Sequence, residues 1–519
     1  MKKKVLVLLD PGQYSIKVGI PGGNSEKPIF NIKTIYTDDS LLRITDSKIH
    51  KGSNLLGLGG DLTWWIGDDA ISCYASHKTI RARDFLTATP PISFEDFVER
   101  LIQHIFYSLL RIDCESVSVC IIKRHSFPMT SLKTLIEVLF DQCGCHSISV
   151  LPADVLALYS LFQPSSSKAP SDTTVSHSPS LSFLTQSLTG IVVNIGDSCV
   201  DIIPIYAGYV IENAIKRLDI GGNDCTSIVL EALKIRKVTK GRAKHLTLAP
   251  STPGPSKKSI IVPIEPFSSL PLSEIARVLK ENFSAVCPSA HSIFSKYSET
   301  LSGTRAECSS VTCNIGMEML LCHDLFFYPK ELRNPSSFKH KLYRSLFKHS
   351  MVDSCISAAN DMVQKDTTFI EPCLIPSSPA GSSPDLDDRD GPRIPALVRN
   401  VLASMSCEKE SLPGLICASL MASEIDLRKG LASNIVICGG PALVPGFAER
   451  IETEVKTMLK AMQINVLMSC TRVVKVDNPE HLCYSGACKY VLDERFKEQC
   501  VKRTEYNKKK WKAFPCLIE

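Results

Sequence analysis

The sequence predicts an α/β protein with two lobes. Two stretches of the 519-residue chain, 5–20 and 191–206, share one pattern: a buried strand, a short turn that contains glycine, and a returning strand. A third stretch, 434–458, has the pattern of a buried strand, a Gly-Gly pair and a helix. Strands that alternate with helices favour a layered α/β architecture. The repeated hairpin indicates that each lobe is built around one copy of it.

The composition is that of a globular intracellular protein. Hydrophobic residues make up 44% of the chain and charged residues 22%, and 519 residues leave room for two or three domains. The net charge of +5 is too small to indicate a nucleic-acid groove, so we expect no sequence-specific nucleic-acid binding. The apolar run Val5–Leu9 is too short to cross a membrane, and we expect no membrane partner. The 21 scattered cysteines are typical of a reducing compartment.

The first hairpin carries residue types that suit a phosphate group and its metal ion. Val5–Leu9 predicts a buried strand, Asp10 to Gly12 a turn, and 15–20 the returning strand. Asp10 then ends the first strand beside the turn, where a carboxylate can orient metal-bound water. Lys17 on the returning strand can neutralise phosphate charge. A single turn of this kind is weak evidence, but the chain contains a second one.

Two later turns have similar chemistry. In the second hairpin, Gly196 and Asp197 form the turn, and such small residues let backbone N–H groups approach a phosphate closely. Further along, Gly439 and Gly440 join a buried strand to a helix, which brings the helix N-terminus beside a ligand. Each turn therefore predicts a place where the backbone faces phosphate or adenosine.

The remaining apolar patterns predict the layers around these turns. Apolar residues recur at helical spacing in some stretches and form short continuous runs in others, and we assign both to the core. The predicted helices are 93–110, 129–143, 154–162 and 273–286, and the predicted strands are 116–122, 147–151 and 434–438.

Three stretches, 163–187, 236–269 and 372–392, interrupt these patterns and read as insertions into loops. The first is rich in Ser and Pro, and we expect it to be disordered. Each insertion is a candidate site for phosphorylation or partner binding, against the simpler interpretation of a solvated linker.

Taken together, the three turns resemble those of the actin family. The resemblance is carried by LLDPGQYSIKVGI at 8–20, IPIYAGYVIENAIKRLDIGGNDCT at 203–226 and EIDLRKGLASNIVICGGPALVPGFAERIETEV at 424–455. It implies an α/β, two-lobed actin-like ATPase fold of duplicated ribonuclease-H-like domains with a nucleotide cleft between the lobes. The first lobe would be 1–162, the second 188–455, and 456–519 would return to the first.

The resemblance also implies a ligand and the residues that hold it. The ligand would be ATP or ADP, with Mg²⁺ possible. A Lys-Glu pair on helix 273–286 would flank the adenine, and Asp10 would hold Mg²⁺ through water. The implied nucleotide-binding residues are Asp10, Gly12, Lys17, Gly196, Asp197, Lys280, Glu281, Gly439 and Gly440.

The positions that the resemblance assigns to catalysis are altered. Ala153 stands at the position of the glutamine that holds the attacking water, Asn194 at that of the metal-facing acid, and Asp201 at that of a supporting histidine. Gln13 and Tyr14 replace smaller residues of the first loop, and Tyr14 would crowd the γ-phosphate. Because the loss of one such group costs several kcal/mol, we expect nucleotide binding with weak or absent ATPase activity. An empty cleft retained with the fold is the alternative.

The sequence resembles two subgroups of the family, one nuclear and one cytoskeletal. The segments 11–20 and 474–479 resemble nuclear actin-related proteins, which are structural subunits of chromatin-remodelling and histone-exchange complexes. The segments 106–162 and 425–429 resemble the dynactin pointed-end protein about as well. We favour the nuclear setting over the cytoplasm. The expected partners are protein subunits of a larger complex, with actin as a further candidate.

Overall fold

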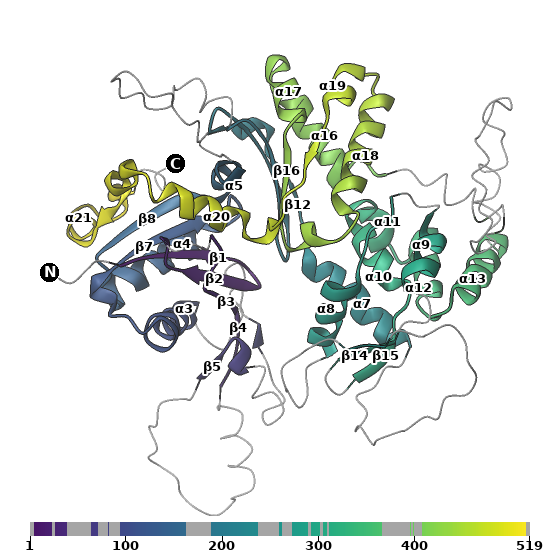
Figure 1. Ribbon diagram of the computed structural model, residues 1–519, viewed down its shortest axis with the longest axis horizontal. Coiled ribbons are helices and arrows are strands. Elements are labelled where there is room, and N and C mark those ends of the chain that lie inside the picture. The colour runs from purple at the N-terminus through teal and green to yellow at the C-terminus, as the bar shows by residue number, and fades with distance from the viewer. Residues whose placement is uncertain are drawn as a thin grey trace, which may run out of the picture.

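The chain folds into an α/β protein with two lobes (Figure 1). The N-terminal lobe contains β1, β7 and β8, and the second lobe contains β9, β16 and most of the helices (Figure 1). In this computed structural model the described residues are 5–22, 26–38, 64–70, 81–82, 94–161, 188–236, 259–261, 272–288, 292–301, 305–308, 311–365, 395, 398 and 407–514.

The first lobe is built on a six-stranded sheet with the order β18-β8-β7-β1-β2-β3. The central strand β1 pairs antiparallel with β2 on one side and parallel with β7 on the other, and β8 continues the parallel part. The strands are β1 (Val5–Pro11), β2 (Ser15–Gly19), β3 (Phe30–Lys33), β7 (Val117–Lys123), β8 (Ser147–Pro152) and β18 (Val501–Lys502).

The second lobe repeats this arrangement. Its sheet has the order β11-β10-β9-β16-β17, with β12 also paired to β10. Its central strand β9 again has an antiparallel hairpin partner on one side and parallel strands on the other. The sequence pattern that predicted two hairpins is confirmed by this duplication. The strands are β9 (Gly190–Ile195), β10 (Val200–Tyr206), β11 (Tyr209–Val210), β12 (Lys216–Leu218), β16 (Ile435–Gly439) and β17 (Val473–Val474).

Two helices, α5 and α20, lie between the sheets and share one apolar cluster with both. α5 follows β8, and α20 packs closely against it. A Cβ at Gly486 of α20 would lie 1.9 Å from the Leu156 carbonyl oxygen of α5, so glycine permits this close approach. The cluster joins Leu8 of the first sheet to Val192 of the second. The helices are α5 (Ala153–Leu161) and α20 (Leu482–Tyr490).

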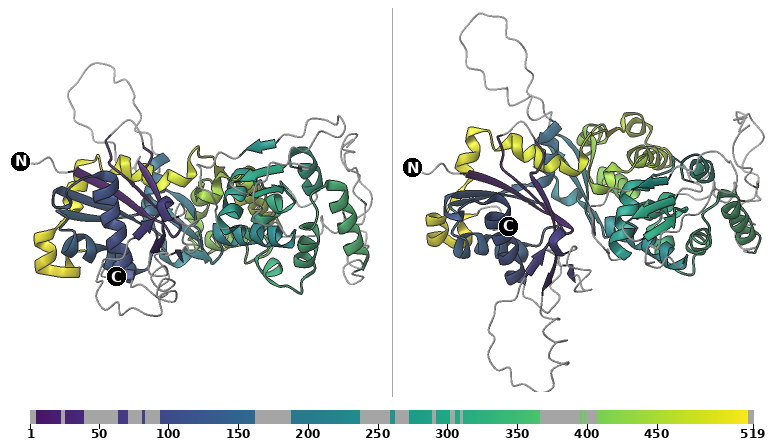
Figure 2. Two further views of the ribbon diagram at one scale, coloured as in Figure 1. Left: turned by 90° about the horizontal axis from the view of Figure 1, so that it is seen from below. Right: turned by 60° about the horizontal axis from the view of Figure 1, so that its bottom comes forward.

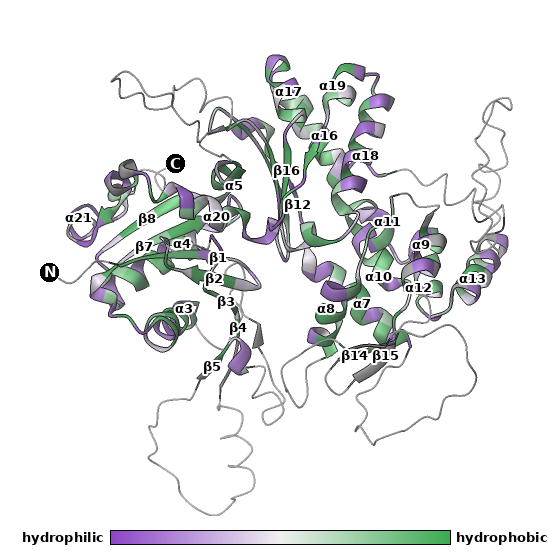
Figure 3. Cartoon of the chain, in the orientation of Figure 1, coloured by the Kyte–Doolittle hydropathy of each residue, from purple (hydrophilic) through white to green (hydrophobic). Residues whose placement is uncertain are grey.

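The other helices cover the outer faces of the sheets. The central strands β7 and β16 are mostly apolar, whereas helices such as α18 have both apolar and polar faces (Figure 3). In the first lobe these are α3 (Phe94–Gln103), α4 (Met129–Glu137) and α21 (Arg503–Lys509). In the second they are α7 (Gly222–Ile235), α8 (Leu272–Phe283), α16 (Leu412–Ala422), α17 (Ile425–Ala432), α18 (Phe447–Ala461) and α19 (Asn465–Cys470).

An outer part of the second lobe adds short helices and a small sheet, β13-β14-β15, and another small sheet, β5-β4-β6, lies on the first lobe (Figure 1). The helices are α9 (Ile293–Thr300), α10 (Glu318–Leu321), α11 (Pro329–Arg333), α12 (Phe338–Leu346) and α13 (Val352–Lys365). The strands are β13 (Ser259–Ile261), β14 (Arg305–Cys308), β15 (Val311–Asn314), β4 (Ile35–Asp38), β5 (Trp64–Ile66) and β6 (Arg81–Ala82).

The chain returns to the first lobe later than the sequence predicts. Residue 456 lies inside α18, and β17 still pairs with β16 of the second sheet. The return begins at α20, and β18 then joins the first sheet beside β8. Figure 2 shows these C-terminal helices, in yellow, beside the purple and blue strands of the first lobe.

The predicted insertions contribute little to the described residues. The stretches 163–187 and 372–392 lie outside the described ranges. Of 236–269, Arg236 ends α7 and 259–261 form β13, which pairs with β14. Among the described residues, no helix combines the length and apolar character that a membrane span requires.

Candidate functional site

A cavity of about 430 Å³ lies where the three predicted turns meet α8. It collects residues from both lobes, which are far apart in the sequence. Asp10 is the one predicted binding residue that does not line it. The predicted residues that do are Gly12, Lys17, Gly196, Asp197, Lys280, Glu281, Gly439 and Gly440.

Asp10 and Lys17 form a buried ion pair beneath the first turn. The register of β1 and β2 places them opposite each other, and Lys17 Nζ donates to Asp10 Oδ2 at 2.9 Å. Burial alone would raise the pKa of Asp10, but the charges of Lys17 and Arg124 outweigh it, and the pKa is lowered. The carboxylate is therefore ionised, and its second oxygen, Oδ1, is buried without a hydrogen-bond partner.

The first turn is tied directly to the second. The Gly12 amide donates to the Ser15 carbonyl at 3.0 Å, and a Cβ on Gly12 would lie 2.6 Å from that oxygen. Gln13 Oε1 accepts from the Ser198 amide at 2.9 Å and from the Ser198 hydroxyl, so the two turns meet through this side chain. Gln13 Nε2 is buried without a partner. It is Gln13, and not Tyr14, that occupies the space between the turns.

Tyr14 instead belongs to a contact between the first lobe and α8. Its hydroxyl donates to Glu274 Oε1 at 2.9 Å, and its ring lies 3.7 Å from the guanidinium carbon of Arg277. Lys33 of β3 also donates to Glu274 Oε1, at 2.8 Å. Burial and the neighbouring Glu274 raise the pKa of Tyr14, so the phenol stays protonated and can donate. These bonds cross the cavity entrance from one lobe to the other.

The second turn is held by the start of α7. The Gly222 amide donates to the Gly196 carbonyl at 3.0 Å, and the Asn223 amide to the Asp197 carbonyl at 2.7 Å. A Cβ on Gly221 would lie 2.3 Å from Asp197, so only glycine fits there. The Asp197 carboxylate accepts from Arg277 Nη1 at 3.0 Å. The side chain is thereby directed at α8.

The far end of the cavity combines the Gly439 turn with α8. Gly439 has φ of +103°, and a Cβ there would lie 2.0 Å from the Ile195 carbonyl oxygen. Lys280 Nζ donates to the Gly222 carbonyl at 2.8 Å, and burial raises the pKa of Glu281. Gly440 has open space beside its Cα. The predicted Lys-Glu pair thus lies at the cavity wall beside two glycines.

Two cavity residues that the sequence did not suggest carry unsatisfied atoms. Ser284 Oγ and His323 Nε2 are buried without partners, and both residues line the cavity. Burial and the Lys280 charge lower the pKa of His323 to about 3, so its imidazole is neutral. Both groups remain available to a polar ligand edge.

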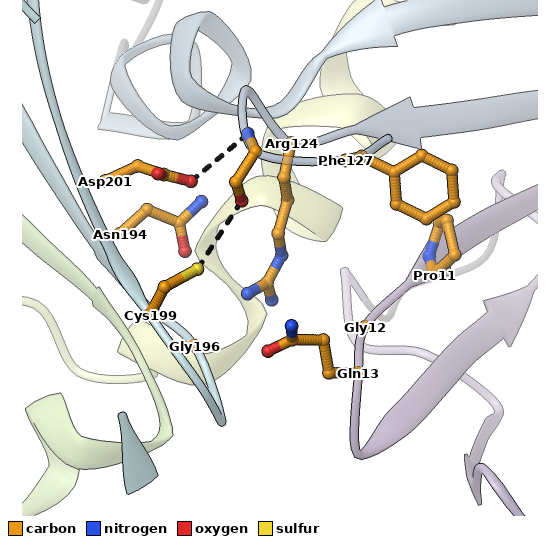
Figure 4. Close-up of a pocket in the computed structure, with 10 residues that line it drawn as sticks. Pro11, Gly12, Gln13, Arg124, Phe127, Asn194, Gly196, Cys199 and Asp201 are labelled. Carbon is orange, nitrogen blue, oxygen red and sulfur yellow. Dashed lines mark hydrogen bonds between the residues drawn. The ribbon is translucent and has the colours of Figure 1, made fainter. Parts of the chain in front are cut away.

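The residues at the predicted catalytic positions have structural partners instead. Ala153 is the first residue of α5 and is buried. Asn194 Nδ2 donates to Asp154 Oδ1 at 3.1 Å. Asp201 Oδ2 accepts from the Ser126 amide at 3.3 Å, a bond that Figure 4 marks with a dashed line. Ala153 has no group that could hold a water, and the Asp201 carboxylate is engaged by the loop after β7.

Arg124 is the main residue that sequence reasoning missed. It lies between the second turn and Gln13 (Figure 4) and lines both the main cavity and a smaller pocket beside it. A Cβ at Gly196 would lie 3.2 Å from Arg124 Nη1, and Arg124 Nε is buried without a partner. Its position directly after the parallel strand β7 is a usable signal, because ligands of α/β sheets bind at the carboxyl ends of such strands.

The residues present do not fit a Mg²⁺ ion of the kind that the family resemblance implies. Asp10 is paired with Lys17, Asn194 has no charge, and Asp201 is directed at Ser126. Mg²⁺ prefers carboxylate oxygens and its own water, and a nearby guanidinium repels it. Across the described part of the chain, no His, Cys, Asp and Glu residues gather into a group of three that could hold a metal.

The duplicated sheets and the cavity between them define a two-lobed α/β protein with a ligand cleft. The chain belongs to the actin family, since the family model described as Actin matches residues 1–513. It is 24% identical over 475 residues to actin-related protein 3 of Schizosaccharomyces pombe, across 88% of this chain and 82% of the relative. It is 25% identical over 365 residues to actin-related protein 3 of Oryza sativa, across 68% and 72%. A putative actin, actin-29 of Dictyostelium discoideum, is 19% identical over 511 residues, across 96% and 93%.

These relatives correct one prediction and limit another. The preference for the nucleus over the cytoplasm is wrong, because the similarity is to actin-related protein 3 of plants, fungi and animals rather than to a nuclear protein. The proposed role in chromatin remodelling has no support from them. An actin-related protein is what the comparisons support, and they do not decide between subgroups.

Proposed function

We propose that this chain is a cytoskeletal actin-related protein that acts as a structural subunit of a multiprotein complex. Its cleft binds ATP or ADP and hydrolyses ATP weakly or not at all. The relatives named above are actin-related protein 3 and an actin, and this supports the cytoskeletal setting.

One observation supports the proposal that the chain does not hydrolyse ATP. The residues at the predicted catalytic positions, Ala153, Asn194 and Asp201, either lack a suitable group or are bonded to the protein. Phosphoryl transfer to water requires an oriented water and a preorganised field around the phosphate. A missing polar group of this kind typically costs about 3 kcal/mol of transition-state stabilisation, or more than a hundredfold in rate. Several such losses together leave little catalysis.

Nucleotide binding depends on other residues, and these are in place. The glycine turns, Lys280 and Glu281 line one cavity, and Ser284 and His323 add unsatisfied polar atoms to it. A binding cavity with a few convergent polar groups is the usual form of a small-molecule site. The nucleotide would then hold the two lobes together without being consumed.

Phosphate release from purified protein in excess ATP tests the lack of hydrolysis. We expect the rate to stay at that of the buffer, and we expect ADP to bind in a parallel calorimetric titration. Sustained phosphate release that is abolished by Asp10→Asn would contradict the proposal. The Glu424→Ala variant serves as a preparation control, because Glu424 is an exposed residue directly before α17 and does not line the cavity.

Affinity purification of a tagged copy from its own cells tests the setting. We expect co-purifying actin or actin-related subunits at constant ratios and a cytoplasmic signal in microscopy. Recovery of chromatin-remodelling subunits in the same ratios would instead show that the proposed setting is wrong.

A closed and empty cleft is the second candidate. It is favoured by the bonds of Gln13 to Ser198 and of Tyr14 to Glu274, which join the walls of the cavity. A titration in which ADP, ATP and adenosine all fail to bind would select this candidate.

A further inference from the structure

We propose that the phosphate end of the cleft takes a phosphoryl anion without a divalent cation, and that the guanidinium of Arg124 supplies the positive charge in its place. This inference rests on the proposed nucleotide binding and specifies how the phosphates are held. It makes ADP and ATP metal-independent ligands of this chain.

The placement of Arg124 is the first support. β7 ends at Lys123, and the chain then enters the space between the two hairpin turns, where Arg124 lies beside Gln13 (Figure 4). Its guanidinium lies against the backbone of Gly196, whose hypothetical Cβ would be 3.2 Å from Nη1. The turns are where phosphates meet backbone N–H groups in a cleft of this kind. Arg124 is thus positioned between the two turns that would hold a phosphate.

The unsatisfied donors are the second support. Arg124 Nε and Gln13 Nε2 are buried and have no hydrogen-bond partner, and both residues line the main cavity. Two unsatisfied acceptors, Asp10 Oδ1 and Asn194 Oδ1, belong to residues that do not line that cavity, whereas a third, Glu480 Oε2, belongs to a residue that does. Buried donors without partners are costly, and an oxyanion satisfies such donors with strong, charge-assisted bonds. The place of Arg124 and Gln13 between the two turns therefore suits an anion.

The charges that face the cavity agree with this. At the phosphate end these are Arg124 and Lys17, of which Lys17 is paired with Asp10. Asp10 and Asp154 do not line the cavity, and Asp201 lines only the smaller pocket beside it. A divalent cation placed beside Arg124 would be repelled by its guanidinium, and a phosphoryl group would be attracted by it.

The acids that do line the cavity are mostly engaged elsewhere. Asp197 pairs with Arg277, and Glu274 pairs with Lys33. Glu480 is the exception: it lies 3.5 Å from His481, whose pKa is lowered by burial, and its Oε2 has no hydrogen-bond partner. Burial raises the pKa of Glu281 at the opposite end. Between the turns, the group that a phosphoryl anion would meet is therefore Arg124, because Lys17 is paired with Asp10.

Calorimetric titration of the full chain with ADP, ATP and adenosine, in Mg²⁺ and in EDTA, tests the inference. We expect EDTA to change the Kd of ADP and ATP by less than about threefold, because no metal takes part. Arg124→Gln should weaken both by at least tenfold, about 1.4 kcal/mol, while adenosine, which has no phosphate, binds equally to both proteins. Arg124→Lys should recover part of the loss, and Lys123→Gln, one residue away and outside the cavity lining, should bind as the unaltered chain does.

The outcomes separate this inference from the proposed function. If adenosine binds and ADP binds only with Mg²⁺, the inference is wrong and nucleotide binding stands. If none of the three ligands binds in either buffer, nucleotide binding itself is wrong. Adenosine titration and thermal unfolding show whether Arg124→Gln folds. If it does not, the Kd of ADP and ATP for the unaltered chain, compared between Mg²⁺ and EDTA, still tests whether binding needs a metal.

Discussion

Replacement of Glu274 by alanine should loosen the contact between the two lobes. Glu274 Oε1 accepts two bonds from the first lobe, from the Tyr14 hydroxyl at 2.9 Å and from Lys33 Nζ at 2.8 Å. The lobes are also joined by the bonds of Ser198 to Gln13 and by the contact of Arg277 with the Tyr14 ring, so Glu274→Ala removes two of several contacts across the cavity. The variant should still fold, since Glu274 lies in the first turn of α8 and not in the apolar core.

The size of the effect follows from the burial of the bonds. A hydrogen bond to a charged group contributes about 1.5–3 kcal/mol when buried. The Glu274 side chain is 13% exposed and that of Lys33 is 25% exposed, so solvent reduces the ion pair to below about 1 kcal/mol. The two bonds together then stabilise the closed entrance by about 2 kcal/mol, and their loss raises the open fraction by about thirtyfold.

Hydrogen–deuterium exchange of the unliganded chain measures this directly. Peptides that cover the first turn at 12–15 and the second turn at 196–199 should exchange about tenfold or more faster in Glu274→Ala, because opening exposes their amides. Peptides from β7 should exchange as before, and the matched Glu424→Ala variant should change neither turn. A change of less than threefold in both turns would mean that Glu274 does not hold the lobes together, and the argument would fail.

Two predictions concern stability. Gly486→Ala should lower the free energy of unfolding, measured in urea, by about 2 kcal/mol or more, because the new Cβ would lie 1.9 Å from the Leu156 carbonyl oxygen. The control is Gly430→Ala in helix α17, whose Cβ would make only an ordinary 3.5 Å contact with Thr189, so this variant should be neutral or slightly stabilising. Equal effects of the two substitutions would refute the prediction. Lys339, which is buried over the Tyr328 ring, has a pKa lowered to about 8 by burial. The unfolded chain keeps its proton up to pH 10.5, so this burial cost is fully present below pH 8 and is relieved, by up to about 3 kcal/mol, as the pH rises from 8 to 10.5. Unfolding of the unaltered chain and of Lys339→Met at several pH values should therefore differ in slope across that window, and parallel curves would contradict the assignment.

Local pattern was sufficient to predict the parts of the cleft that lie within one hairpin. The strand, turn and returning strand at 5–20 place Asp10 opposite Lys17 whatever the rest of the chain does, because antiparallel pairing fixes the register. Gly12 and Gly439 were recognisable because each turn brings backbone too close for a Cβ. These features depend only on residues that are close together in the sequence, so a single sequence is enough to predict them.

What the sequence could not provide is the set of contacts between distant segments. Tyr14 and Glu274 are 260 positions apart, and nothing local indicates that a phenol in one lobe reaches a carboxylate in the other. For this reason Tyr14 was assigned to the γ-phosphate space, which Gln13 occupies instead. Arg124 was missed for a related reason: a cation after a buried strand usually faces solvent, and only the packing of the second lobe encloses it.

The altered catalytic positions and the contacts across the cleft have one physical explanation. A hydrolysing cleft must admit water and a metal ion to the phosphate and must open to release product. Here Gln13 and Arg124 take the space between the turns, and Glu274 joins the lobes at the entrance. Under the proposed function, each change would lower the rate of turnover and would also favour one closed arrangement of the lobes. A ligand that is held by such a cleft and not consumed adds its binding free energy to the stability of the folded chain, so selection for a rigid subunit would account for both kinds of change.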